Sequence, residues 1–205
     1  MTMTDADRDL VAGLTGQADT ASYARLRARL TDQAGQAGLL DVAYRTMDSP
    51  VGPLLLAATP RGLVRVAYAS EDHDGVLARL AGMLSPRVLH APARLDDAAR
   101  QLEEYFGGQR RQFGLTLDFE LSRGFRLAVL THLRDIGYGS TSSYAAVAAA
   151  AGRPAAVRAV GSACANNPLP VVVPCHRVVR SDGSIGQYVG GSDAKRLLLE
   201  LESAA

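Results

Sequence analysis

The sequence has few cysteines and almost no net charge. Cys164 and Cys175 are the only cysteines among 205 residues, too few for a disulfide framework or a four-thiolate zinc site. We therefore expect free thiols, a reducing compartment and no bound metal. Basic residues number 22 and acidic residues 21, so the whole chain cannot bind nucleic acid or anionic lipid by bulk attraction. Any nucleic-acid site must be local.

Long apolar runs are also missing. No stretch approaches the roughly 20 apolar residues of a membrane-spanning helix, and residues 1–10 are acidic rather than basic and then apolar. These features predict that the chain has no membrane span and no signal peptide. They predict a cytoplasmic location. The content of 47% hydrophobic and 21% charged residues excludes overall disorder and suits one large domain or two small ones.

The first 40 residues are predicted to form a helical appendage. Tyr23, Leu26 and Leu30 recur at helical spacing, and Gly35 and Gly38 then interrupt the pattern. A flexible lead, a cover for a basic face and a partner-docking helix are all possible roles. We favour a structural appendage packed on the following domain.

Residues 41–120 have the pattern of a small α+β domain. Strands are predicted over 42–47, 54–58 and 63–68, with a hairpin turn at 59–62 that contains proline and glycine. Helices are predicted over 76–84 and 95–106, followed by a short strand over 115–119.

Residues 121–205 have the pattern of a mostly helical domain. An amphipathic helix is predicted over 124–136, and helices over 143–151 and 155–165 flank a Gly-Arg-Pro break. Two short helices joined by a tight turn outline a helix-turn-helix, although many helical hairpins look the same. Nine basic residues face six acidic ones over 120–205, so the small positive excess lies in this half.

The segment 166–179 carries the chemistry. Prolines on both sides of an apolar run predict an extended strand that leads to Cys175. Since neighbouring residues of a strand face opposite ways, His176 should not bond the thiol directly and should act through a water or a third group. A carboxylate should orient this histidine. The predicted helix over 192–202 offers Glu200 and Glu202; its apolar stripe lies nearer Glu202, but the sequence does not decide between them.

These residues resemble a known family. The string Pro-Cys-His-Arg-Val-Val at 174–179, preceded by Arg-Ala-Val-Gly at 158–161 and Asn-Pro at 167–168 and followed by Gly183, Tyr188, Gly190 and Gly191, is similar to the O6-alkylguanine-DNA alkyltransferases, also called methylated-DNA–protein-cysteine methyltransferases. The resemblance is close over 124–202 and looser at 49–54. It implies an α+β fold: a small ribonuclease-H-like α/β N-terminal domain, then a mostly helical domain with a helix-turn-helix and the cysteine site.

The resemblance implies a role for each residue of the site. Cys175 would accept the alkyl group of O6-alkylguanine, and of O4-alkylthymine, from double-stranded DNA in one irreversible turnover. His176 would take the thiol proton through a water, and Glu202 would orient His176. Tyr144 would donate to the guanine ring nitrogen. Asn167 would be the hinge between the recognition helix and the cysteine segment, although the adjacent Asn166 is an alternative for this role.

DNA contacts and the substrate pocket are implied in the same way. Arg158 would fill the gap left by the extruded base, and the other DNA-binding residues would be Tyr144, Ala156 and Gly161. The substrate pocket would comprise Pro170, Val178, Tyr188, Val189 and Gly190. A monomer without cofactor or metal is expected.

Two features depart from the family pattern, and two other functions compete with it. Cys164 and Ala165 stand where relatives often carry a larger apolar and a basic residue, which would widen the pocket and weaken phosphate anchoring. One alternative is a DNA-binding, damage-recognition or regulatory module without chemistry, but such a module needs no Cys175 and His176. A cysteine hydrolase is the other, but adjacent cysteine and histidine suit a direct dyad poorly.

Overall fold

The computed structural model describes residues 20–203, and the chain divides into two compact units after Leu40. In the first unit, α2 runs over Thr20–Gln36 and Gly38 follows in the left-handed region with φ +66°. The predicted helical positions Tyr23, Leu26 and Leu30 lie on α2. The part of the helical prediction that covers residues 1–19 lies outside the described residues.

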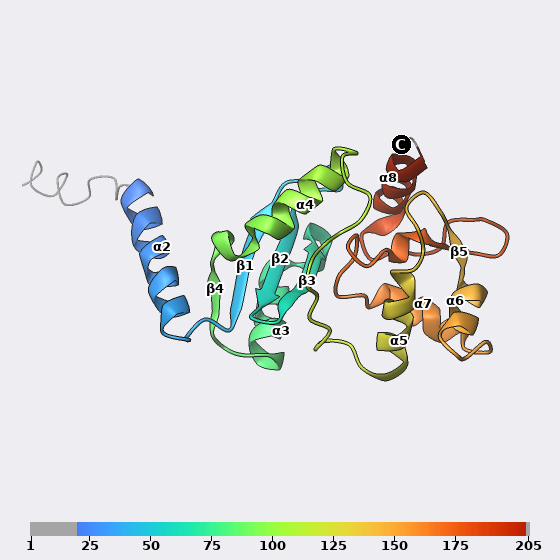
Figure 1. Ribbon diagram of the computed structural model, residues 1–205, viewed down its shortest axis with the longest axis horizontal. Coiled ribbons are helices and arrows are strands. Elements are labelled where there is room, and N and C mark those ends of the chain that lie inside the picture. The colour runs from blue at the N-terminus through green and yellow to red at the C-terminus, as the bar shows by residue number, and fades with distance from the viewer. Residues whose placement is uncertain (1–19, 204–205) are drawn as a thin grey trace, which may run out of the picture. The chain divides into compact units, whose positions relative to one another are not determined.

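The second unit begins with a sheet of four strands in the order β3-β2-β1-β4 (Figure 1). Strands β1 (Val42–Met47), β2 (Leu54–Thr59) and β3 (Gly62–Tyr68) are antiparallel neighbours, as expected for apolar runs joined by tight turns. Strand β4 (Val88–His90), which the sequence analysis missed, pairs parallel to β1.

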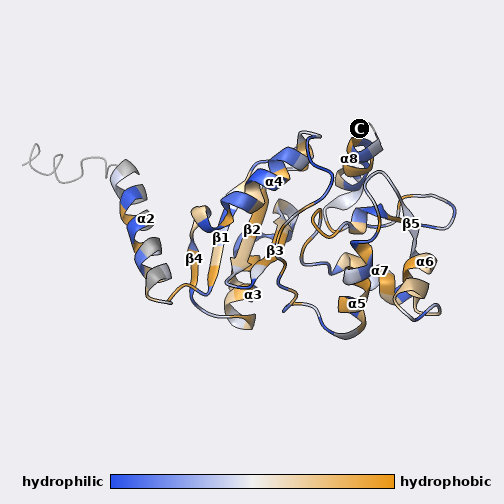
Figure 2. Cartoon of the chain, viewed as in Figure 1, coloured by the Kyte–Doolittle hydropathy of each residue, from blue (hydrophilic) through white to orange (hydrophobic). Residues whose placement is uncertain are grey.

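The same part of the chain contains the helices α3 (His73–Met83) and α4 (Asp96–Phe106). Val76 and Leu80 of α3 pack in one buried cluster with Val42, Leu55 and Val64 of the strands. The strands are largely hydrophobic, whereas α4 carries hydrophilic residues on one side (Figure 2). Its buried residues include Leu102 and Tyr105.

The strand predicted over 115–119 is wrong. Only Leu117 forms a bridge, with Leu63 of β3. Beyond this bridge the chain is held by a side chain instead of a ladder: the buried carboxylate of Asp118 accepts a hydrogen bond of 2.5 Å from the Thr59 hydroxyl and one of 3.1 Å from Arg61.

The remaining elements are mostly helical, as predicted: α5 (Gly124–Leu133), α6 (Tyr144–Ala150), α7 (Val157–Ala165) and α8 (Gly191–Ser203). Helix α5 ends three residues before its predicted end, because 134–136 form i to i+3 hydrogen bonds that tighten the chain toward Gly137. A two-residue parallel pairing of β5 (Ser142–Ser143) with β6 (Val178–Val179) was not predicted. Together the elements confirm the predicted α+β fold class.

The extended strand predicted through Cys175 is also wrong. Cys175–Arg177 form a short 3-10 helix, η3, and the preceding loop turns so tightly that Val171 has φ +71°. This left-handed conformation is unusual for a β-branched residue. Prolines do exclude an α-helix here, but turns satisfy the same restriction as well as a strand does. The loop is held by a backbone hydrogen bond from Val173 N to Leu169 O, 2.8 Å.

Within residues 20–203, no helix is both long and apolar enough to cross a membrane. Nor do any three histidine, cysteine, aspartate or glutamate side chains in this range lie close enough together to hold a metal ion.

Candidate active site

Cys175 is buried at the first position of η3, with 1% of its surface exposed. Its Sγ accepts a hydrogen bond of 3.1 Å from Nδ2 of Asn167. The same Nδ2 donates to Val173 O at 2.9 Å, and Oδ1 accepts from Leu169 N at 2.9 Å. Because Asn167 follows α7 by two residues, its amide ties the end of that helix to the cysteine loop.

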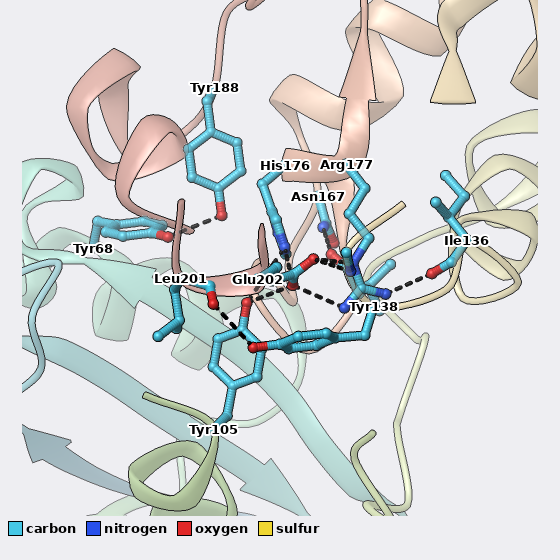
Figure 3. Close-up of polar contacts among 12 residues, drawn as sticks. Tyr68, Tyr105, Ile136, Tyr138, Asn167, His176, Arg177, Tyr188, Leu201 and Glu202 are labelled. Atoms are coloured by element: carbon cyan, nitrogen blue, oxygen red, sulfur yellow. Dashed lines mark hydrogen bonds and ion pairs between the residues drawn. The ribbon is translucent and has the colours of Figure 1, made fainter. Parts of the chain in front are cut away.

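His176 is completely buried and faces Glu202 of α8 (Figure 3). Its Nε2 lies 2.8 Å from Oε1 of Glu202, whereas its buried Nδ1 has no hydrogen-bond partner among the described residues. Since a carboxylate only accepts hydrogen bonds, Nε2 carries the proton and Nδ1 keeps a free lone pair. Glu200 is exposed, so Glu202 is the carboxylate that contacts the histidine.

Several donors converge on the Glu202 carboxylate. Arg177 donates from Nε to Oε2 and from Nη2 to Oε1, both at 2.9 Å. Tyr105 donates to Oε1 at 2.6 Å, and Gly139 N donates to Oε2 at 3.2 Å. Burial alone would raise the pKa of Glu202, but the hydrogen bonds from His176, Arg177 and Tyr105 outweigh it and lower this pKa to about 2. Glu202 is therefore an anion at neutral pH.

The resting thiol is protonated. Burial raises the pKa of Cys175 to about 11, although the hydrogen bond from Asn167 and the charge of Lys195 act in the opposite direction. Lys195 is itself buried and donates from Nζ to Val178 O at 2.6 Å. Burial also lowers the pKa of His176, so its imidazole is neutral near pH 7 and can accept a proton.

The loop between β6 and α8 lies against Tyr68 and Tyr144, and itself carries Tyr188. A Cβ at Gly186 would stand 2.5 Å from the Tyr144 hydroxyl, and one at Gly190 would stand 2.5 Å from Cζ of Tyr68. Tyr68 and Tyr188 share a hydrogen bond of 2.9 Å between their hydroxyls. Tyr144, the first residue of α6, is half-buried. Both glycines therefore let the loop approach ring atoms that any larger residue would hit.

The other predicted pocket residues lie on this loop or at the cysteine segment. Pro170 and Val178 are buried, whereas Val189 is half-buried. Val178 begins β6 directly after η3.

The predicted DNA-binding residues lie on or beside α7. Arg158 is exposed in its first turn, while Ala156, which precedes the helix, and Gly161 are half-buried. Cys164 is buried near the end of α7, where burial raises the pKa of its thiol, and Ala165 is exposed. The structure therefore gathers the catalytic candidates Cys175, His176, Asn167 and Glu202, and sets Arg158 apart on the exposed side of α7.

Sequence reasoning missed the remaining partners of this network. Tyr105 looks like an ordinary core residue of α4, because it continues the apolar stripe begun by Leu102. Lys195 offered a signal, as the only lysine of the sequence and one placed on the apolar face of the C-terminal helix. Arg177 lay inside the quoted motif, but nothing in the sequence indicated that it binds Glu202.

Two family models match nearly the whole second unit. The 6-O-methylguanine DNA methyltransferase ribonuclease-like domain matches residues 42–119, and the DNA binding domain of the same name matches residues 124–204. The methylated-DNA–protein-cysteine methyltransferase of Mycobacterium tuberculosis strain H37Rv is 37% identical over 166 residues, which cover 80% of this chain and 93% of the relative. The chain belongs to the methylated-DNA–protein-cysteine methyltransferase family. The resemblance stated from the sequence is thus confirmed.

Other members of the methyltransferase family are similar to this chain over the same extent. The constitutive enzyme of Bacillus subtilis strain 168 is 36% identical over 160 residues, covering 78% of this chain and 94% of that one. Among solved structures, the M. tuberculosis O6-methylguanine methyltransferase superposes with a TM-score of 0.69 at 38% identity, covering 80% of this chain and 93% of that chain. The structure of the M. tuberculosis protein in complex with DNA gives 0.66 at 38% identity, covering 79% and 93%.

Proposed function

We propose that this protein repairs alkylated DNA directly, by moving the alkyl group of O6-alkylguanine, or of O4-alkylthymine, onto Sγ of Cys175. Membership in the methyltransferase family supports alkyl transfer as the reaction. The observation that supports the residue assignment is the buried Nδ1 of His176, which has no hydrogen-bond partner among the described residues and belongs to the residue that follows the protonated Cys175 in η3. A neutral imidazole with a free lone pair, within reach of a thiol through one water, is what activation of the nucleophile requires.

The proton moves before or with the attack. Glu202 fixes the Nε2–H tautomer, so Nδ1 takes the Cys175 proton through one water. The thiolate attacks the alkyl carbon in line with the bond to O6; the S–C bond forms, the C–O6 bond breaks, and its electron pair stays on the base. Tyr144 donates a hydrogen bond to a ring nitrogen as this charge develops. The guanine released from the alkyl group then gains the proton that the thiol lost to His176, so charge and atoms balance.

The product explains why the protein acts once. S-alkylcysteine is a thioether without a good leaving group, so neither water nor a second thiol restores Cys175. The mechanism therefore consumes one protein molecule for each alkyl group.

DNA is the partner that family membership supports, and we assign it to the exposed side of α7. Arg158 would enter the duplex and replace the extruded base, since the O6 substituent cannot be reached inside the stack. The other residues that would contact the DNA are Ala156, Gly161 and Tyr144. The pocket around the base would be lined by Pro170, Val178, Tyr188, Val189 and Gly190.

We assign residues 1–40 to an appendage, 41–120 to the ribonuclease-like domain and 121–205 to the DNA-binding domain of a monomeric protein.

Intact-mass measurement after incubation with duplex DNA carrying O6-methylguanine tests the proposal. The protein should gain one methyl group per molecule, and Cys175→Ala should gain none while it still binds the duplex. DNA binding without an adduct in the unaltered protein would favour the recognition module instead. Release of product in excess of protein would favour a turning-over hydrolase.

A further inference from the structure

Tyr105 reaches the proton-transfer network from a distant part of the chain. It belongs to α4, in the segment that matches the ribonuclease-like domain, and none of its surface is exposed. Its hydroxyl donates to Oε1 of Glu202 at 2.6 Å and lies 3.5 Å from Nε2 of His176 (Figure 3). The oxygen that accepts from Tyr105 is thus the oxygen that accepts from the histidine.

The ring of Tyr105 is held in place by its neighbours. Its centroid lies 5.2 Å from that of Phe113 and 6.1 Å from that of Tyr138, and the Tyr138 ring is edge-on. Burial and the adjacent charge of Glu202 raise the pKa of Tyr105 far above its ordinary value. The hydroxyl therefore keeps its proton near neutral pH and donates it to the carboxylate.

We propose that Tyr105 is a positioning residue of the alkyl transfer, whose hydrogen bond draws negative charge from Oε1 of Glu202 and so keeps His176 neutral and ready to accept the thiol proton. The inference rests on the proposed function, because it concerns the proton acceptor of that reaction. It also gives the ribonuclease-like domain a part in the chemistry, since that domain supplies the donor.

Other charged and titratable groups face His176 and set the background. They are Cys175 and Arg177 beside it in η3, Glu202 and Lys195 of α8, and Tyr188 of the loop before α8. Arg177 and Lys195 favour the neutral imidazole, whereas Glu202 favours the imidazolium. Tyr105 moderates the only group in this set that favours the charged form.

The sign of the effect follows from this arrangement. Without the hydroxyl, Oε1 carries more negative charge, the imidazolium is stabilised, and the pKa of His176 rises. Fewer molecules then hold the neutral base at low pH. In Tyr105→Phe, the acidic limb of the pH dependence of transfer should move to higher pH by up to about one unit, which is the upper limit because the lost hydrogen bond acts on His176 only through Glu202.

The experiment compares single-turnover transfer rates across pH for the unaltered protein, Tyr105→Phe and Tyr138→Phe. Tyr138 is the matched control, because its ring packs edge-on against that of Tyr105 but its hydroxyl donates to Leu201 O at 3.3 Å and not to Glu202. We expect a displaced limb for Tyr105→Phe and an unchanged limb for Tyr138→Phe. A Tyr105→Phe protein that is uniformly slower at every pH, with its limb in place, would show that the tyrosine is only structural and overturn the proposal.

Two further measurements keep the test decisive. NMR titration of the His176 ring in Cys175→Ala and in the Cys175→Ala, Tyr105→Phe double variant reports the imidazole pKa without any transfer reaction. Failure of the proposed function would leave this readout intact, and an unchanged titration would overturn the role of Tyr105 separately. If Tyr105→Phe does not fold, a fluorinated tyrosine at position 105, which is a stronger donor, should move the acidic limb to lower pH; no movement contradicts the proposal.

Discussion

Replacement of Glu202 by glutamine should remove much of the stability that the buried network gives. The substitution keeps the shape but removes the charge, which leaves the Arg177 guanidinium buried without a counter-ion and places an amide donor among donors. The carboxyl has a pKa of about 2 in the folded protein and an ordinary value of 4.5. This difference corresponds to about 3 kcal/mol at neutral pH, which agrees with the roughly 3–5 kcal/mol for breaking a buried ion pair.

The pH dependence of this loss follows from the direction of the pKa shift. Because the folded-state pKa is depressed, the contribution is complete above the unfolded pKa of 4.5 and disappears as pH falls toward 2. Urea unfolding at pH 7 should therefore show Glu202→Gln less stable by about 3 kcal/mol, with a gap that narrows steadily below pH 4.5. Glu200→Gln, at an exposed position of the same helix, is the control and should change little. A Glu202→Gln cost under about 1 kcal/mol, or a gap that does not change with pH, would refute the reasoning.

Three further changes test other parts of the site. Arg158→Ala should slow transfer from duplex DNA at least tenfold, about 1.4 kcal/mol of barrier, but hardly alter transfer from free O6-benzylguanine; equal slowing of both would exclude a base-extruding role. Gly190→Ala should slow transfer from both substrates, because the added Cβ would stand 2.5 Å from the Tyr68 ring and the loop would have to move. The assay is single-turnover kinetics, and an unchanged rate would show that the loop does not border the base. Thiolate absorbance in Cys164→Ala should report the titration of Cys175 near pH 11, since burial disfavours the thiolate; titration near its ordinary value of 9 would contradict the buried resting thiol.

The sequence predicted the elements with strong local patterns. Hairpins between apolar runs, the amphipathic helices and the helix-turn-helix outline depend on nearest-neighbour chemistry, so β1 to β3 and α5 to α8 lie close to their predicted ranges. Predictions failed where tertiary contacts decide the backbone. The segment 115–119 forms a single bridge to β3, at Leu117, in place of a ladder, and the prolines before Cys175 support a turn as readily as a strand.

The site divides in the same way. Cys175, His176 and Glu202 could be proposed because they sit in a short motif or on a helix with a clear apolar stripe. Tyr105 could not, because its hydroxyl meets a carboxylate 97 residues away, and no local pattern distinguishes it from a core tyrosine. The choice between Glu200 and Glu202 likewise needed the position of α8 beside η3.

The central claim is that Cys175 accepts one alkyl group and keeps it. The most direct test is peptide mapping after reaction with duplex DNA that carries an isotope-labelled O6-methylguanine. The account predicts one equivalent of label, all of it on the peptide that contains Cys175 and none on the peptide that contains Cys164, the other buried thiol. Label on Cys164, or loss of the methyl group from the DNA with no label on the protein, would contradict it.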